Sequence, residues 1–220
     1  GDLARTLTQE NGQPLQSSTL EVMWTADFYE HYAGLTDSIY GRSTSLSSNS
    51  YSMINREPIG VVGIIVPWNA PIILLARSLA PCLAAGNSTI IKPASYTAGV
   101  SSEFVNLIHL TSAFPKGILN HITGPGGKVG AEIARNQDVD MVSFTGDTST
   151  GKEIMRLASN NVKKQSLELG GKSPNIIFGD ADIDKAAGGA VSGACLSLAG
   201  QVCYAGTRIL VQETIHQMFL

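Results

Sequence analysis

Residues 59–92 read IGVVGIIVPWNAPIILLARSLAPCLAAGNSTIIK, and this stretch decides the fold. Its first part, residues 59–66, is rich in β-branched residues, a composition typical of a parallel strand buried on both faces. The periodicity that follows predicts a helix over residues 72–85, closed by Gly86, and then a short strand over residues 88–91. A strand, a helix and a second strand in this order predict a right-handed βαβ unit.

The same alternation continues toward the C-terminus and predicts an α/β fold with a mostly parallel sheet. Such sheets bind ligands at the carboxyl ends of their strands, so we expect the functional residues at that edge. Further helices are predicted over residues 97–110, 129–135, 149–158 and 182–198, and further strands over residues 118–122, 139–144, 165–169, 175–178 and 207–211.

The segment before this unit divides into two parts. Residues 1–35 read as helical, and we expect Gly34 to cap the last helix. Residues 36–57 are rich in serine and their apolar alternation is weak, which favours a loop over an exposed hairpin used for oligomerisation. An amphipathic apolar face of the helical part is predicted from Leu20, Val22, Met23, Ala26, Phe28 and Tyr29.

Bulk composition limits the possible classes of protein. The chain has 220 residues, of which 43% are apolar and 15% are charged, so it can bury a sizeable core and is not disordered. The net charge of −3 predicts neither a nucleic-acid partner nor a polybasic membrane patch. No run approaches the ~18 apolar residues that a membrane span requires, so none is predicted.

Cysteine and histidine usage narrows the class further. An odd, sparse set of three cysteines suits a reducing compartment, and we expect a cytoplasmic protein. Cys82 and Cys195 read as small buried hydrophobes on apolar helices. The four histidines lack metal-ligand spacing, so no metal site is predicted. The chain begins at Gly1 and stops at Leu220 within an apparent helix start, so we expect a fragment or a partly represented protein.

Two side chains are candidate catalytic groups, one as a nucleophile and one as a general base. Cys203 is flanked by glycine and glutamine in a non-helical segment, and it would act as a nucleophile in its thiolate form. Glu168 lies between two leucines on a predicted strand and therefore points away from them. It is either a solvent-facing residue or a general base in a cleft, where the following Gly170-Gly171 leaves room for a ligand.

Three turns are candidates for binding a phosphate or a nucleotide. Residues 144–152 run from a strand through hydroxyl residues into a helix, whose free N–H groups can hold a phosphate; the alternative is an ordinary N-cap at Asp147 or Thr148. Residues 124–130 are glycine-rich before a helix and permit close approach to a ligand. Lys92 ends a buried strand, where a charged group needs a partner. Its ammonium group either contacts a ribose or phosphate of a ligand or reaches solvent at the end of an extended side chain.

Taken together, these segments resemble the aldehyde dehydrogenase superfamily of the non-acylating type. Five motifs occur in the family's order and spacing: Pro67-Trp68-Asn69-Ala70-Pro71, Lys92-Pro93-Ala94, Phe144-Thr145-Gly146, Glu168-Leu169-Gly170-Gly171-Lys172-Ser173-Pro174 and Gly200-Gln201-Val202-Cys203. The resemblance implies a Rossmann-like NAD(P)-binding domain over residues 1–170 and the start of a catalytic domain over residues 171–220. It also implies an oligomerisation hairpin over residues 38–57, which reverses the preference for a loop, and a homodimer or homotetramer.

The resemblance implies a role for each candidate catalytic residue. Cys203 attacks a small-molecule aldehyde, and the Asn69 amide and the Cys203 backbone N–H hold the oxyanion. Hydride passes to NAD or NADP, and Glu168 activates the water that releases a carboxylic acid. Lys172 supports the region of Glu168 and Cys203. The alternatives are a relative that transfers the acyl group to coenzyme A and a truncated member without catalytic activity.

The cofactor contacts are likewise implied by resemblance. Many NAD-preferring members carry Glu where this chain has Ser95, and that Glu repels a 2′-phosphate. Ser95 removes the repulsion, so NADP stays open beside NAD. Asp147 also departs from the more frequent Ser and would be mildly unfavourable near a phosphate. The implied contact residues are Val66, Pro67, Trp68, Lys92, Ser95, Gly126, Phe144, Gly146, Asp147, Thr150 and Leu169.

Overall fold

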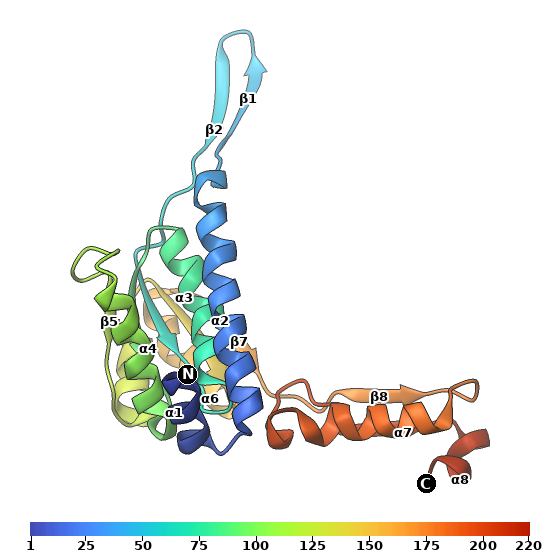
Figure 1. The fold of residues 1–220 in the computed structure, drawn as a ribbon. Helices are drawn as coiled ribbons and strands as arrows, with labels where there is room; N and C mark the ends of the chain where they lie inside the picture. Colours follow the sequence, from blue (N-terminus) through green and yellow to red (C-terminus); the bar gives the residue numbers. More distant parts are fainter.

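The computed structural model describes residues 1–220, except for the side chain of Ser197. A five-stranded parallel sheet in the order β5-β4-β3-β6-β7 forms the centre of the larger part of the molecule (Figure 1). The α/β class predicted from the strand–helix alternation is confirmed. The strands are β3 (Val61–Ile65), β4 (Ser88–Lys92), β5 (Leu119–His121), β6 (Met141–Gly146) and β7 (Lys164–Leu169).

Helices cover both faces of this sheet. One face packs against α1 (Asp2–Asn11), α2 (Leu15–Leu35), α3 (Pro71–Ala84) and α4 (Ala98–Leu110), and the other packs against α5 (Ala131–Arg135) and α6 (Thr148–Ala158). The central strand β3 sends Val62 and Ile64 into the first core and Ile65 into the second. Burial on both faces explains why this strand reads as an unbroken apolar run.

Short helical turns join these elements. The 3₁₀ turns of the sheet domain are η1 (Thr36–Ser38), η2 (Ser95–Thr97) and η4 (Ser159–Asn161), and a single π-helical turn, η3 (Gly126–Gly130), leads into α5. The elements occur in the predicted order, and most of their ends lie one or a few residues from the predicted ones. Among the residues that the structure describes, no helix combines the length and apolarity needed to cross a membrane.

The serine-rich segment forms a hairpin. Strands β1 (Arg42–Ser47) and β2 (Ser50–Ile54) pair antiparallel and project from the end of α2, away from the sheet (Figure 1). The hairpin expected from the family resemblance is therefore present, and the loop favoured by composition alone is wrong. Its apolar side chains Leu46, Tyr51 and Met53 are exposed. Its use in oligomerisation stays a prediction.

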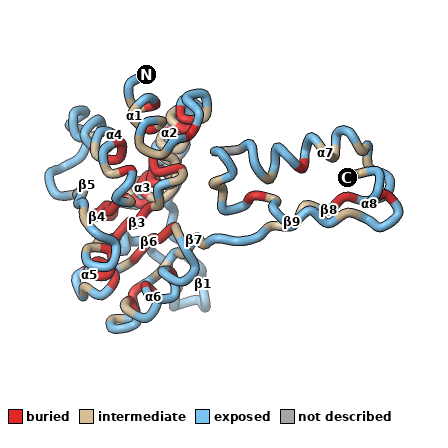
Figure 2. Tube along the Cα trace, turned by 90° about the horizontal axis from the view of Figure 1, so that it is seen from below, coloured by how far each residue is buried: buried red, intermediate tan, exposed pale blue. Residues whose placement is uncertain are grey.

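The last quarter of the chain extends away from the sheet domain. Strands β8 (Pro174–Ile177) and β9 (Arg208–Val211) pair in parallel, and Figure 2 shows that this extension is mostly exposed. Its small core contains Ile177, Ala190 and Ile215. The remaining elements are α7 (Ile183–Val191), the π-turn η5 (Ser192–Leu196), the 3₁₀ turns η6 (Ser197–Gly200) and η7 (Glu213–Ile215), and α8 (His216–Phe219).

Two expectations about this extension are wrong. The helix expected over residues 182–198 is α-helical only to Val191 and continues as the π-turn η5; Leu198 and Ala199, which have left-handed backbone conformations, then interrupt it within η6. Cys195 is exposed rather than buried. Apolar flanking residues predict burial only where a second layer covers the helix, and the small core beside α7 includes no residue of η5.

The buried face of α2 matches the predicted one only in part, since Val22 and Tyr29 pack against the first core. The buried residues are Ser18, Glu21 and Thr25, whereas Leu20 and Met23 of the expected apolar face are 39% and 58% exposed. Hydrogen bonds satisfy the inward polar groups: Ser18 bonds Thr8, and Thr25 donates to the Glu21 carbonyl. Contacts with other elements therefore set which face of this helix is buried, and the spacing of apolar residues along the sequence does not predict such contacts. Gly34 lies inside α2 rather than capping it, since the helix ends at Leu35.

The close packing of β3 on α5 yields a stability prediction. A Cβ added at Gly63 would lie 2.2 Å from Cγ2 of Ile133, so Gly63→Ala should destabilise the protein by about 1–3 kcal/mol through overpacking. Gly34 provides the control, because a Cβ there meets nothing within 4 Å and Ala stabilises a helix by up to about 1 kcal/mol. Thermal or urea unfolding measures both; equal midpoints for the two variants would contradict the packing argument.

Candidate active site

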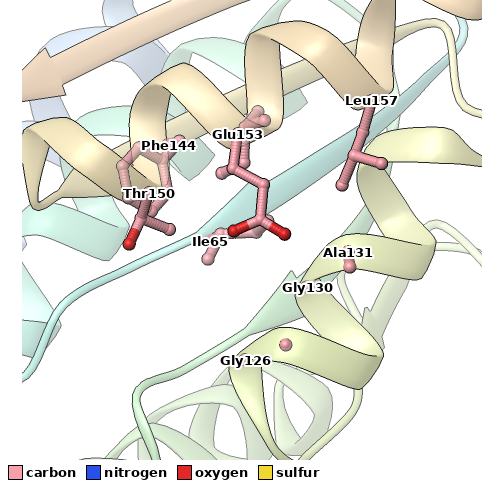
Figure 3. A pocket seen from close by; sticks show the side chains of 10 residues that line it. Ile65, Gly126, Gly130, Ala131, Phe144, Thr150, Glu153 and Leu157 are labelled. Atoms are coloured by element: carbon pink, nitrogen blue, oxygen red, sulfur yellow. The ribbon is translucent and has the colours of Figure 1, made fainter.

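A cavity of about 230 Å³ lies between α6 on one side and η3 with α5 on the other, with Ile65 of β3 beneath it (Figure 3). Three residues predicted to contact a cofactor line it: Gly126, Phe144 and Thr150. Glu153 also lines it and was missed by sequence reasoning. Its spacing of three residues from Thr150 on one helix was the available signal, because such residues share a helix face.

Lys92 lies beside this cavity and is buried. Its side chain is 3% exposed and donates from Nζ to the Pro93 carbonyl at 2.6 Å. A Cβ added at Gly130, which lines the cavity, would lie 3.7 Å from Cδ of Lys92. Burial lowers the pKa of Lys92. The alternative in which Lys92 reaches solvent is therefore wrong, and no carboxylate in the described part of the chain forms an ion pair with this ammonium group.

Asp147 caps helix α6. Its carboxylate accepts hydrogen bonds from the Ser149 hydroxyl, from the Ser149 N–H at 2.7 Å and from the Thr150 N–H at 3.4 Å. These bonds, the Ser149 hydroxyl first, lower the pKa of Asp147. The N-cap alternative thus describes this helix start, whose N–H groups already have an anionic acceptor. A cofactor contact at Asp147 or at the neighbouring Gly146 stays a prediction.

The other predicted cofactor residues follow the carboxyl ends of the strands. Val66 is buried and its N–H donates to the Lys92 carbonyl at 3.2 Å. Pro67 is half-buried, Trp68 is 39% exposed, and Ser95 is exposed at the start of η2. Leu169 ends β7, where its side chain packs so closely on α6 that a Cβ at Gly151 would lie 2.6 Å from it. These residues lie at the same edge of the sheet as the cavity but do not line it.

A second cavity, of about 310 Å³, brings the candidate nucleophile and oxyanion donor together. Asn69 and Cys203, which are far apart in the sequence, both line it. The Asn69 amide donates from Nδ2 to the Gln201 carbonyl at 2.7 Å, which ties the start of α3 to the Cys203 turn. The remaining wall comes mainly from α2 and α3: Ser17, Leu20, Glu21, Trp24, Phe28, Ala70, Ile73, Leu74 and Arg77, with Leu198, Val202 and Tyr204.

Glu168 lies next to this cavity and is paired with Arg77. Its carboxylate, on a side chain that is 60% exposed, is 3.8 Å from the Arg77 guanidinium. Both residues line an adjoining cavity of about 380 Å³, so Arg77 lines both spaces. Arg77 also donates to Thr145 Oγ1 at 3.3 Å. The sequence did not single out Arg77. Arg77 lies four residues after Ile73 on α3, so the two share a helix face, and both line the cavity. An exposed pair of this kind contributes at most about 1 kcal/mol to stability.

Lys172 and Gly171 belong to the segment that links β7 to β8. The Lys172 ammonium group donates to the Gly171 carbonyl at 3.1 Å, and the Lys172 carbonyl accepts from Arg208 at 2.8 Å. A Cβ added at Gly171 would lie 3.8 Å from the Cys203 carbonyl oxygen. The backbone of this linker therefore lies beside the Cys203 turn. Support of Glu168 by the charge of Lys172 stays a prediction.

The cysteines differ in accessibility. Cys203 is exposed on a turn that follows Gly200, whose φ of 77° is left-handed. Cys82 is buried in α3, and burial raises the pKa of its thiol to about 12. Because a thiolate is the reactive form, Cys82 is inert near neutral pH, whereas Cys203 faces a cavity with an amide donor.

The aldehyde dehydrogenase family profile matches residues 1–220. The chain belongs to the aldehyde dehydrogenase family. This aldehyde dehydrogenase chain is 46% identical over 220 residues to betaine aldehyde dehydrogenase of Bacillus subtilis, covering 100% of the chain and 44% of that protein. It is 41% identical over 219 residues to hydroxyisobutyraldehyde dehydrogenase of Mycolicibacterium austroafricanum, covering 100% of the chain and 43% of that protein. The chain thus spans less than half the length of these relatives.

Solved structures of the family share the fold. Betaine aldehyde dehydrogenase of Staphylococcus aureus in complex with NAD⁺ superposes with a TM-score of 0.95 at 42% identity, covering 99% of this chain and 43% of that one. An NADP-dependent enzyme of Escherichia coli superposes with a TM-score of 0.94 at 38% identity, covering 99% and 45%. These neighbours confirm the Rossmann-like fold of the aldehyde dehydrogenase chain.

The contrast between two cysteines gives a direct test in the protein that carries this chain. Iodoacetamide at pH 8 should modify Cys203 and leave Cys82 unmodified, because a pKa of about 12 keeps the Cys82 thiol protonated. Peptide mass spectrometry reads the modified positions. Cys82→Ser should not change the labelling of Cys203. Rapid labelling of Cys82 in the native protein would show that the core around α3 opens.

Proposed function

We propose that the protein carrying this chain oxidises an aldehyde to a carboxylic acid with NAD or NADP as hydride acceptor. The single observation that carries the proposal is the cavity that Asn69 and Cys203 share. A thiol nucleophile beside an amide donor is the pair that addition to a carbonyl group requires. The family and the NAD⁺-bound relative support the same reaction type.

The first half of the reaction depends on Cys203 and Asn69. The Cys203 thiolate adds to the aldehyde carbon, and the carbonyl oxygen becomes an oxyanion that the Asn69 amide and the Cys203 N–H stabilise. Asn69 has two N–H bonds and uses one for Gln201 in this structure. Bound NAD or NADP would supply the acceptor for the hydride that leaves this carbon. The C–S bond remains, so Cys203 holds the acyl group as a thioester.

The second half depends on Glu168. Its carboxylate accepts a proton from water as the water oxygen attacks the thioester, and the carboxylic acid leaves as the Cys203 thiolate re-forms. The ion pair with Arg77 holds the carboxylate at the rim of the neighbouring cavity in this structure. A carboxylate at this position favours hydrolysis over transfer of the acyl group to coenzyme A, which is the alternative function.

The cavity beside α6 fits the adenosine part of the cofactor. Gly126 and Gly127 leave its floor open, since a Cβ at either position meets nothing within 4 Å, and Phe144 and Thr150 supply an apolar and a hydroxyl wall. The buried Lys92 ammonium group beside it suits ribose hydroxyls or phosphate. The β1–β2 hairpin, with its exposed apolar residues, supports assembly as a homodimer or homotetramer.

The assignment of the two catalytic residues has a kinetic test. Cys203→Ser should abolish aldehyde-dependent NAD(P)H formation. Glu168→Gln should keep a first-turnover burst of NAD(P)H and slow the steady state about 100-fold or more, the scale of general-base catalysis. Stopped-flow absorbance at rising aldehyde concentration measures both phases. Retained turnover in Cys203→Ser would rule out the nucleophile, and acceleration of the wild type by coenzyme A would favour the acyl-transferring alternative.

The choice between NAD and NADP has a separate test at Ser95. Ser95→Glu should weaken binding of NADP at least tenfold, because a carboxylate repels a 2′-phosphate, and should change the affinity for NAD little. Ser95→Gln keeps the size without the charge and serves as the control. Fluorescence titration with both dinucleotides measures the dissociation constants. Equal losses for NAD and NADP in Ser95→Glu would contradict the position assigned to this residue.

A further inference from the structure

We propose that Glu21, a buried carboxylate on α2, is the positioning residue that fixes the oxyanion donor Asn69 through the N-terminus of α3. This inference rests on the proposed function, since it assigns a partner to the oxyanion donor. Glu21 is 2% exposed and lines the same cavity as Asn69 and Cys203. Nothing in the sequence distinguishes it from a surface carboxylate on an ordinary helix.

The first argument concerns the acceptors of the backbone N–H groups in the first turn of α3. The helix begins at Pro71, which has no N–H, and its N-cap residue Ala70 has no side chain that could accept a bond. Glu21 Oε1 accepts from the N–H of Ile72 at 2.9 Å and of Ile73 at 3.2 Å. The next N–H, of Leu74, bonds the Ala70 carbonyl at 3.1 Å. A side chain from another helix therefore supplies the whole cap.

The second argument is that Glu21 is itself held in place. Its other carboxylate oxygen, Oε2, accepts from Nε2 of Gln13 at 2.9 Å, and Gln13 is 2% exposed. The carboxylate thus makes three hydrogen bonds inside the protein, which is what a buried charged group needs. Burial raises the pKa of Glu21, while the three bonds act in the opposite direction.

The third argument is proximity to the reacting group. Asn69 lies two residues before Pro71, so the cap fixes the direction in which the chain leaves Asn69. Asn11, at the end of α1, donates to the carbonyls of Asn69 and Trp68 at 3.2 and 3.4 Å. The end of α1 and the inner face of α2 therefore hold the oxyanion segment from two sides. Oxyanion stabilisation depends on the donor's position, which gives these contacts a kinetic consequence.

The chain offers a matched control for loss of the charge of a cap. Glu10, on α1, is half-buried and accepts from the N–H of Val100 at 3.0 Å at the start of α4. Glu10→Gln and Glu21→Gln therefore remove the same charge from the same kind of contact, one at α4 and one at α3. A stability loss is expected in both variants, and a catalytic loss is expected in Glu21→Gln alone.

The test is a double-mutant cycle on the aldehyde-dependent hydride transfer step of the complete protein. In Glu21→Gln the rate of the first turnover should fall about 10- to 100-fold, with cofactor affinity unchanged. In the Asn69→Ala background the same substitution should add less than about a twofold effect, because the group it positions is gone. Glu10→Gln should leave the rate unchanged. Single-turnover NAD(P)H absorbance measures the four rates of the cycle and the rate of the Glu10→Gln control.

A second variant keeps the test decisive where Glu21→Gln does not fold. Asn11→Ala removes the donor to the Asn69 and Trp68 carbonyls without leaving a buried charge, and it should slow hydride transfer in the wild-type background alone. An undiminished effect of either substitution in the Asn69→Ala background would overturn the positioning role. Absence of NAD(P)H formation by the wild type would instead overturn the proposed function, so the two failures are distinguishable.

Discussion

Burial of β3 on both faces is the constraint on which the rest of the structure depends. The helices on each side of it belong to crossover connections between parallel strands, so the carboxyl ends of β3, β4, β6 and β7 meet at one edge of the sheet. The residues that follow these strands, from Asn69 to Leu169, come together at this edge although the sequence separates them. Apolar packing in the middle of the sheet therefore brings the polar functional residues together at the edge formed by the carboxyl ends of the strands.

The polar contacts near that edge include two helix caps of different kinds. Asp147 caps α6 from its own turn, whereas α3 takes its cap from Glu21 on another helix. A local cap forms with its helix, but a distant cap fixes two helices relative to each other. The loss of a carboxylate that bonds buried N–H groups leaves donors unsatisfied, so the arrangement of α2 on α3 tolerates little change.

The sequence allowed prediction of the elements governed by local pattern and chemistry. The parallel strands and the helices between them have the predicted order, whereas the hairpin was expected only from the family resemblance. The structure brings Asn69 and Cys203 to one cavity, and their catalytic roles stay predictions. The inward face of α2 was not predictable, because burial of Glu21 depends on N–H groups some fifty residues further along the chain. Arg77 escaped notice for the same reason, since its partner Glu168 lies on another element.

The position of Cys203 follows from how the two parts of the molecule meet. The C-terminal extension has a core built around Ile177, Ala190 and Ile215, too small to fix a turn by apolar burial alone. One hydrogen bond, from the Asn69 amide to the Gln201 carbonyl, joins the Cys203 turn to the sheet domain. The backbone at Gly171 also lies close to this turn, because a Cβ there would be in van der Waals contact with the Cys203 carbonyl oxygen. The oxyanion donor therefore also serves as a tie to the nucleophile's turn, and whatever orients Asn69 orients both groups at once.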